Sequence, residues 1–342
     1  MFLKKFSPGA TLCLLATIAA CSKPSDPPPS DSARIANLGP PESDIPLSLG
    51  EGRLRVDGGR IWFRVAGTGK GTPVILLHSG PGLSSYSLKS LEELGNDRPV
   101  ARYDQLGGGK SDNLNDTTRM NISHFVVELE ALRKELGYNS AHFIGHGWGA
   151  TLALEYYRAH PEHVASLTFV GAMFDMPSWR AGAQRLIAAL PDSSRKAVAA
   201  AEATLRFNTP EYRGAIRNYF DRYMWSRFVD ADLDSSALHV GQLLFETMHG
   251  PSEFTVIGSL KDYNATSYLP DVRVPTLYVV GETDEAQPSL VRKYASETPG
   301  ARFSQIAKAA HAVTWDNPTA TNAVLRDFLN SVDRLTVGAP SK

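Results

Sequence analysis

The chain has 342 residues, enough for one large domain with an insertion or for two small domains. Apolar residues make up 42% of it and charged residues 21%, which is ordinary for a globular protein. The formal net charge is -1 and no long basic run is present, so the sequence predicts no nucleic-acid partner. Nothing in the sequence predicts an oligomeric state.

An export signal is predicted at the N-terminus. Lys4 and Lys5 precede an apolar stretch, residues 10–20, that is too short to span a bilayer as a stable helix. The stretch leads into Ile-Ala-Ala-Cys, which resembles the bacterial lipobox, in which the cysteine becomes a lipidated N-terminus. We therefore predict that residues 1–20 are a signal peptide and that Cys21 is lipidated. An ordinary signal peptide with a cysteine near its cleavage site is the alternative.

A lipidated cysteine would anchor the protein in a bacterial membrane. Ser22, rather than an aspartate, follows Cys21, which favours the outer membrane with the protein facing the periplasm. Residues 21–48 are rich in Pro, Ser and Asp, and we predict that they form a disordered tether between the anchor and the folded body. The other cysteine is Cys13, inside the signal, so the mature chain would have no free thiol, no disulfide and no cysteine-ligated metal.

Strands alternate with helices in the first part of the folded body, residues 49–172. Residues 74–77 are a continuous apolar run, typical of a buried parallel strand. The apolar spacing over residues 122–136 is helical, and Gly137 is placed to end that helix. The other elements predicted in this part are strands at residues 53–56, 60–65, 100–103, 141–144 and 167–170, and a helix at residues 150–159.

The pattern changes over residues 173–261, where helical stretches follow one another without strands. These predicted helices cover residues 181–189, 194–206 and 211–228. Their aromatic side chains either line a specificity pocket or pack the helices together: Tyr219, Tyr223, Trp225 and Phe228. Alternation resumes over residues 262–335, with strands at residues 276–280 and 301–306 and helices at residues 289–296 and 319–329.

This order of elements predicts an α/β fold with a mostly parallel sheet and helices on both of its faces. The two alternating parts would form the core together. The helical segment between them would be a lid over the carboxyl ends of the strands, where such sheets bind ligands.

The strand at residues 141–144 runs into Gly145-His146-Gly147-Trp148-Gly149 and then into a helix. Strand, tight turn and helix with flanking glycines form the nucleophile elbow of the α/β-hydrolase fold, whose pattern is G-x-S-x-G. The elbow predicts this fold, but Gly147 stands where the pattern has its nucleophilic serine.

The other groups of a hydrolytic site follow in the chain order of this fold. Asp284 comes directly after one late strand, and His311 follows the next strand as the only later histidine. Asp284 would orient the imidazole of His311 and stabilise its protonated form. The backbone N–H groups expected to form an oxyanion hole belong to Ser79, Gly80 and Trp148.

Several motifs resemble those of proline iminopeptidases. Residues 78–82, His-Ser-Gly-Pro-Gly, resemble the HGGPG loop of that family. Residues 103–107, Tyr-Asp-Gln-Leu-Gly, followed by Ser-Asp at 111–112, resemble its YDQxGxGxSD segment. Residues 145–149 resemble its GxSWG elbow apart from the serine. The resemblance covers about residues 50–330 and implies a hydrolase of small peptides or amino-acid amides, with no cofactor and no metal.

Residues 250–254 and 281–285 resemble segments of the branch that contains L-amino-acid amidases and tricorn-associated peptidases. In that branch, glutamates beside the site hold the free α-ammonium of the substrate, and Glu253 and Glu285 match them by position. Two carboxylates around one ammonium suit a buried cation, which needs paired charge. Alternatively, Glu285 is a solvated loop residue and Glu253 caps a helix.

Two residues depart from the family pattern. Ser79 replaces the first glycine after the histidine and places a hydroxyl near the predicted oxyanion hole. Alternatively, serine at position 79 is a harmless substitution that leaves the backbone N–H donor in place. Gly147 lacks the hydroxyl that forms an acyl-enzyme, and losing the nucleophile alone removes on the order of 10⁶ in turnover from a serine hydrolase.

Four interpretations of Gly147 stay open. In the first, the elbow serine of a family hydrolase was changed to glycine through one base change, by engineering or by accident. In the second, the chain is a natural non-catalytic protein that binds amino-acyl or peptide ligands. In the third, His311, held by Asp284, activates a water in the space vacated at Gly147. In the fourth, Ser79 acts as a relocated nucleophile.

Overall fold

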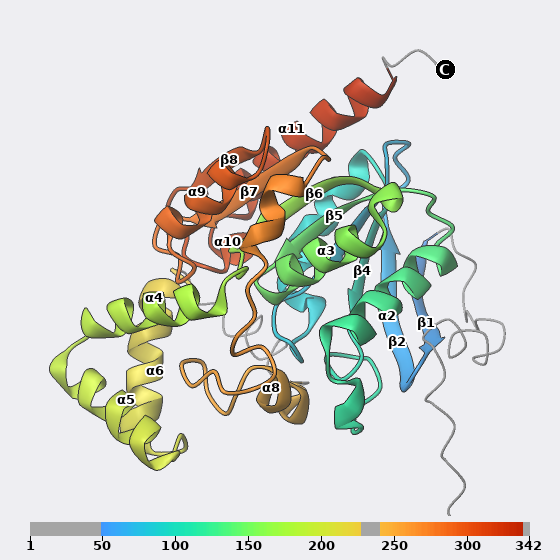
Figure 1. Ribbon diagram of the computed structural model, residues 1–342. Coiled ribbons are helices and arrows are strands. Elements are labelled where there is room, and N and C mark those ends of the chain that lie inside the picture. The colour runs from blue at the N-terminus through green and yellow to red at the C-terminus, as the bar shows by residue number, and fades with distance from the viewer. Residues whose placement is uncertain (1–48, 227–239, 338–342) are drawn as a thin grey trace, which may run out of the picture.

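The computed structural model describes residues 49–226 and 240–337 (Figure 1). The predicted signal peptide, Cys21, the tether and Phe228 lie outside the described residues. An eight-stranded sheet runs through the described part in the order β1-β2-β4-β3-β5-β6-β7-β8. Its strands are β1 (Gly50–Val56), β2 (Gly59–Ala66), β3 (Val74–Leu77), β4 (Val100–Asp104), β5 (Ala141–His146), β6 (Val164–Val170), β7 (Thr276–Gly281) and β8 (Arg302–Ile306).

The sheet is mostly parallel, as the alternation of strands and helices predicts. β1 and β2 form an antiparallel hairpin across Asp57 and Gly58, and β2 pairs antiparallel with β4. From β4 to β8 all neighbouring strands are parallel. All residues of β3 are buried, which explains why its sequence is a continuous apolar run. This topology confirms the predicted α/β class.

Helices cover both faces of the sheet (Figure 1). On one face α2 (Ile122–Glu135), α3 (Trp148–Ala159) and α9 (Pro288–Glu297) contribute to one apolar cluster. On the other face η1 (Ser85–Asn96), α10 (Val313–Asp316) and α11 (Pro318–Val337) contribute to a second cluster. Short 3₁₀ turns are η2 (Thr117–Arg119), η3 (Pro161–His163) and η4 (Thr266–Asp271). Since β3, β5, β7 and β8 are parallel, the loops that follow them meet at one edge of the sheet.

Helices also fill the segment between β6 and β7, which the sequence predicts as a lid. They are α4 (Met176–Ala188), α5 (Asp192–Thr204), α6 (Pro210–Tyr223) and α8 (Gln242–Met248). Asp175 and Thr209 cap α4 and α6 by accepting hydrogen bonds from the first turn of each helix. In Figure 1, α4, α5 and α6 lie together to one side of the sheet. The residue limits given above for the two core parts and the lid remain a prediction.

The predicted end of the third lid helix at residue 228 was wrong, because α6 ends at Tyr223. The backbone carbonyls of Tyr223 and Met224 accept hydrogen bonds from the N–H groups of His311 (3.1 Å) and Ala312 (2.7 Å). In a longer helix these carbonyls would bind N–H groups four residues further on. The contacts with the core loop therefore take the place of the next helical turn.

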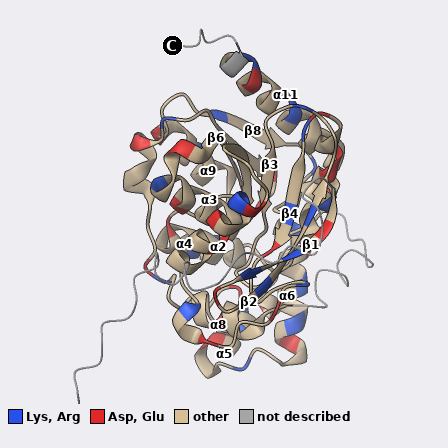
Figure 2. Cartoon of the chain, turned by 90° about the vertical axis from the view of Figure 1, so that its right-hand side faces the viewer, with Lys and Arg blue, Asp and Glu red and all other residues tan. Residues whose placement is uncertain are grey.

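Positions of Lys and Arg and positions of Asp and Glu are interspersed along the ribbon in Figure 2. On α5, for example, Asp192 pairs with Arg195 (3.0 Å) and with Lys196 (2.7 Å). Exposed pairs of this kind contribute little to the stability of the fold. Within the ranges that the structure describes, no helix combines the length and apolar character needed to cross a membrane.

Candidate active site

Residue 147 lies at the turn between β5 and α3. Gly147 has φ 53° and ψ -114°, a backbone conformation that residues with a side chain rarely adopt. Its N–H donates to the Val170 carbonyl (2.9 Å), and its carbonyl accepts from the Ala150 N–H (3.0 Å). α3 begins at Trp148, earlier than the predicted start at residue 150, so one residue separates strand from helix. This is the strand, turn and helix context of a nucleophile elbow.

Asp284 and His311 form a buried hydrogen-bonded pair beyond the carboxyl ends of β7 and β8. Nδ1 of His311 donates to Oδ1 of Asp284 (2.8 Å). The N–H groups of Ala286 (2.8 Å) and Gly281 (3.2 Å) donate to the same carboxylate. Burial alone would raise the pKa of Asp284, but His311 and these N–H groups hold it below its usual range. The pair leaves Nε2 of His311 as the ring nitrogen available for proton transfer.

The imidazole of His311 is more basic than that of an ordinary histidine. Burial alone would lower its pKa, but the charges of Asp284, Glu285 and Glu253 raise it to about 9. An imidazole held in this way can take a proton from a hydroxyl or a water and return it to a leaving group.

His146, which the sequence does not mark as part of the site, stacks on His311. The ring centroids are 4.4 Å apart, with an angle of 30° between the planes. Nε2 of His146 donates to the backbone carbonyl of His311 (3.1 Å). Burial, and then the charge of His311, lower the pKa of His146 to about 3, so this ring is neutral. His146 therefore supports the position of His311 without adding charge. Its place immediately before residue 147 is the one sequence signal for this role.

Gly171, directly after β6, leaves room for the His311 ring. A Cβ at this glycine would overlap with Cε1 and Nδ1 of His311. Gly171 has φ 54°, and its N–H donates to the Val279 carbonyl (2.9 Å), so its backbone cannot easily move away. No sequence pattern marks this residue, because its partner lies far along the chain.

A side chain at residue 147 would meet both Ser79 and His311. An ideal Cβ built on Gly147 would overlap with Oγ of Ser79 and would lie 3.4 Å from Nε2 of His311. The Ser79 hydroxyl therefore fills the space beside residue 147 that faces the Asp284–His311 pair. Ser79 itself is half-buried.

The buried His78 ring fixes the loop that carries Ser79. Nε2 of His78 accepts from the Gln105 N–H (3.0 Å), so Nδ1 is the donor to the Ser79 carbonyl (2.6 Å). Burial lowers the pKa of His78, which favours this neutral tautomer. In a planar trans peptide the N–H points opposite to the carbonyl, so the Gly80 N–H is directed away from His78.

Gln105 links this loop to the turn at residue 147. Its Oε1 accepts from the indole N–H of Trp148 (2.7 Å), and its Nε2 donates to the His78 carbonyl (3.3 Å). Trp148 begins α3, and the first N–H groups of a helix have no partner within the helix. The structure thus brings together the loop of Ser79 and Gly80 and the backbone of Trp148. Backbone N–H groups gathered in this way can stabilise a negatively charged oxygen.

Glu285 follows Asp284 directly in the chain, and the charges of Glu285 and Glu253 both act on the imidazole of His311. Glu285 is only 3% exposed, and its Oε2 has no hydrogen-bond partner among the described residues. Burial, and then the charge of Glu253, raise the pKa of Glu285 well above its usual range. Glu285 is therefore not a solvated loop residue. A cation bound between the two carboxylates would offset both the burial and the repulsion.

The lid contacts this site through Tyr219 and Tyr223. Tyr219 is buried, and its ring packs against Phe254 (4.7 Å between centroids) and Tyr223 (5.1 Å). Burial, and then the charge of Glu285, raise the pKa of the Tyr219 hydroxyl. The Tyr223 carbonyl accepts from the N–H groups of both Glu285 (3.1 Å) and His311 (3.1 Å). These aromatic residues therefore pack within the lid and also join it to the site.

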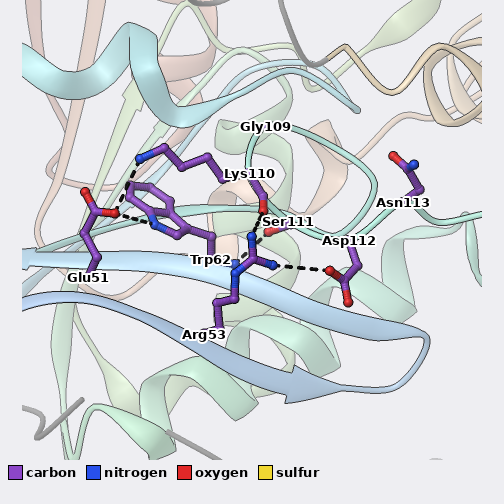
Figure 3. Close-up of a pocket in the computed structure, with 8 residues that line it drawn as sticks. All are labelled: Glu51, Arg53, Trp62, Gly109, Lys110, Ser111, Asp112 and Asn113. Carbon is purple, nitrogen blue, oxygen red and sulfur yellow. Dashed lines mark hydrogen bonds and ion pairs between the residues drawn. The ribbon is translucent and has the colours of Figure 1, made fainter. Parts of the chain in front are cut away.

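A separate hollow of about 780 Å³ opens at the β1–β2 hairpin and includes none of these site residues (Figure 3). In it, Lys110 (3.4 Å) and the Trp62 indole N–H (3.0 Å) both donate to Glu51. Arg53 donates to Asp112 (3.2 Å), which belongs to the Ser-Asp motif noted in the sequence. These groups satisfy one another and stabilise the hairpin. In the described ranges, no cluster of His, Cys, Asp or Glu is arranged to hold a metal ion.

Comparison with known proteins identifies the family. A family model described as the alpha/beta hydrolase fold matches residues 72–318. The proline iminopeptidase of Heyndrickxia coagulans is 37% identical over 296 residues, which are 82% of this chain and 99% of that protein. This chain belongs to the proline iminopeptidase-like family of α/β-hydrolases. The predicted α/β-hydrolase fold is confirmed.

Two solved structures are similar to this chain over nearly their whole length. The crystal structure of VinJ has a TM-score of 0.79 and 30% identity, and the match covers 83% of this chain and 99% of VinJ. The proline iminopeptidase of Mycobacterium smegmatis has a TM-score of 0.78 and 28% identity, covering 84% and 100% of the two chains. The similarity is therefore not confined to a fragment of these relatives.

Proposed function

We propose that this chain hydrolyses substrates with a free amino terminus, such as N-terminal prolyl or amino-acyl peptides and amino-acid amides. One observation carries the proposal: Glu285, directly after Asp284 of the Asp284–His311 pair, is buried, and its Oε2 has no partner among the described residues. The charge of Glu253 acts on the same carboxylate. A substrate ammonium bound there would bring the neighbouring carbonyl to the Asp284–His311 pair. The relatives named proline iminopeptidases support the same substrate class.

In this proposal Asp284 orients His311. Nε2 of His311 takes the proton of the attacking hydroxyl or water as that oxygen bonds to the substrate carbonyl carbon, and it gives the proton to the leaving amine as the C–N bond breaks. The N–H groups of Ser79, Gly80 and Trp148 stabilise the oxyanion. Residue 147 corresponds to the nucleophilic serine of the family. Because glycine supplies no hydroxyl, we expect turnover far below that of a serine-bearing enzyme, with a residual acceleration of about 10³–10⁴ over water.

Prolyl and alanyl p-nitroanilides, compared with their N-acetylated forms, test this function. We expect slow, saturable cleavage of the free-amine compounds and none of the acetylated ones, since an acetylated nitrogen carries no charge. His311→Ala should slow this cleavage further, because the group that accepts and returns the proton is lost. Equal rates for free and acetylated substrates would contradict amine recognition.

A non-catalytic binder is the second candidate, and Gly147 is the observation that favours it. Such a protein would use Glu285 and Glu253 to hold an amino-acyl ligand without cleaving it. Proline amide at a hundredfold excess over its Kd would then increase the free energy of unfolding by about 2.7 kcal/mol. This stabilisation would appear as a higher melting temperature. A shift that is lost in Glu285→Gln, together with no cleavage of any anilide, would decide for the binder. The water route, by contrast, loses support because Oγ of Ser79 fills the space beside Gly147.

A further inference from the structure

We propose that the hydroxyl of Ser79 acts as a slow replacement nucleophile for the one missing at residue 147, an inference that rests on the proposed hydrolytic function. The first support is its position. Any Cβ at residue 147 would overlap with Oγ of Ser79, so this oxygen already lies where the side chain of an elbow residue begins. The turn lacks a hydroxyl at residue 147, and the facing loop carries the hydroxyl of Ser79 directly beside that position.

The second support is the base. The Cβ position of residue 147 lies 3.4 Å from Nε2 of His311, and Oγ of Ser79 overlaps with that position. Oγ and Nε2 therefore lie on either side of this position, although no hydrogen bond joins the two atoms. Rotation about the Cα–Cβ bond of Ser79 can shorten this separation further, and catalytic hydrogen bonds are often long before substrate binds. His311 is held for the transfer by Asp284 (2.8 Å).

The third support is the combination of a fixed backbone and an accessible side chain. Nδ1 of His78 holds the Ser79 carbonyl (2.6 Å), and the adjoining Gln105 holds Trp148 (2.7 Å), so the loop keeps its place against the turn. Ser79 is half-buried, whereas Asp284 and His311 are buried. A substrate carbonyl can therefore reach Oγ while the N–H of Trp148 remains next to it.

The step balances with the groups present. Oγ of Ser79 forms a bond to the substrate carbonyl carbon while Nε2 of His311 takes the hydroxyl proton, and the carbonyl electron pair moves onto oxygen. When that pair returns, the bond to the leaving nitrogen breaks and His311 gives its proton to the departing amine. A water then bonds to the carbonyl carbon of the ester while His311 takes its proton. The bond between that carbon and Oγ of Ser79 breaks, the acid leaves, and His311 returns the proton to Oγ. The rate is low because Oγ is not yet within hydrogen-bond distance of Nε2.

A fluorophosphonate probe, followed by mass spectrometry of the labelled peptide, tests the nucleophile directly. We expect the label on Ser79, its loss in Ser79→Ala, and slow labelling in His311→Ala. Ser84→Ala is the matched control, since its buried hydroxyl lies in the same loop and has no hydrogen-bond partner among the described residues. In the double variant Ser79→Gly with Gly147→Ser, the label should move to the new serine at the turn. Circular dichroism melting curves show that each variant folds.

Two results would overturn the inference. The first is labelling of Ser79→Ala to the same extent as the unaltered chain. The second is no labelling of the unaltered chain although the folded double variant is labelled. The probe carries no amine, so it also separates this inference from the proposed function. A label on Ser79 without cleavage of any free-amine anilide would leave the nucleophile standing and contradict the function. If the unaltered chain and Ser79→Ala cleave those anilides at equal rates, the proposed function stands and Ser79 as the nucleophile is contradicted.

Discussion

The hydroxyl of Ser79 occupies the space that a side chain at Gly147 would need. The two departures from the family pattern are therefore coupled by contact. A glycine at position 79 leaves room for a serine at the elbow, and a glycine at position 147 leaves room for Ser79. Changes at one position should thus be measured together with changes at the other, since residues in contact are not additive.

Glu285→Gln should weaken the use of free-amine substrates. The substitution keeps the shape of the side chain but removes the charge that would pair with the substrate ammonium, an interaction of about 1.5–3 kcal/mol or roughly ten- to hundredfold in kcat/KM. Cleavage of an activated ester without an amine should be nearly unchanged. Glu211→Gln, at an exposed position in the first turn of α6, is the control. A parallel loss on the ester would show that Glu285 supports the site rather than the amine.

The pH dependence should report the neighbours of His311. Burial lowers the pKa of this imidazole, but Asp284 and the two glutamates raise it to about 9. Only the unprotonated ring is a base, so kcat/KM for an amine-free ester should rise with pH up to about 9. Glu285→Gln removes a negative charge and should move this rise to lower pH. A midpoint near that of ordinary histidine, about 6.5, in both proteins would contradict the electrostatic account.

Gly171→Ala should inactivate the site with little effect elsewhere. Its Cβ would overlap with the His311 ring, and a displacement of about 1 Å in a reacting group costs on the order of a hundredfold in rate. Gly214→Ala, inside α6 with no atom within 4 Å of the added carbon, is the control and should stabilise the helix by about 0.5–1 kcal/mol. Rates and thermal unfolding of both variants check this, and an active Gly171→Ala protein would mean that the ring can move.

Much of the fold follows from local patterns in the sequence. The apolar run of β3 and the helical spacing of α2 predict those elements because burial sets both patterns. Asp284 and His311 were found because each follows a strand in the chain order of the fold. Their hydrogen bond of 2.8 Å is what the structure adds.

The supporting contacts of the site could not be predicted in the same way. His146 and Gly171 act on His311 through tertiary contacts between residues that are distant in the chain. The early end of α6 has the same origin, since Tyr223 gives its carbonyl to Glu285 and His311 instead of to another helical turn. Sequence periodicity carries no information about such pairings.

Export and anchoring remain a proposal that fractionation can test. We propose that Cys21 is lipidated and holds the protein in the outer membrane, facing the periplasm. Metabolic labelling with a radioactive fatty acid should then mark the unaltered chain and not Cys21→Ala, and the variant should leave the membrane fraction. An unlabelled chain recovered in the soluble periplasmic fraction would contradict this proposal.

The most direct test of the site compares kcat/KM for prolyl p-nitroanilide between the unaltered chain and the double variant Ser79→Gly with Gly147→Ser. The double variant places a hydroxyl on the Cβ of residue 147, a position that lies 3.4 Å from Nε2 of His311. It also removes the overlap between that Cβ and the side chain of Ser79. We expect a gain of at least about a hundredfold, and a larger gain than in Gly147→Ser alone. A folded double variant that cleaves the anilide no faster than the unaltered chain would contradict the view that this site lacks only a properly placed hydroxyl.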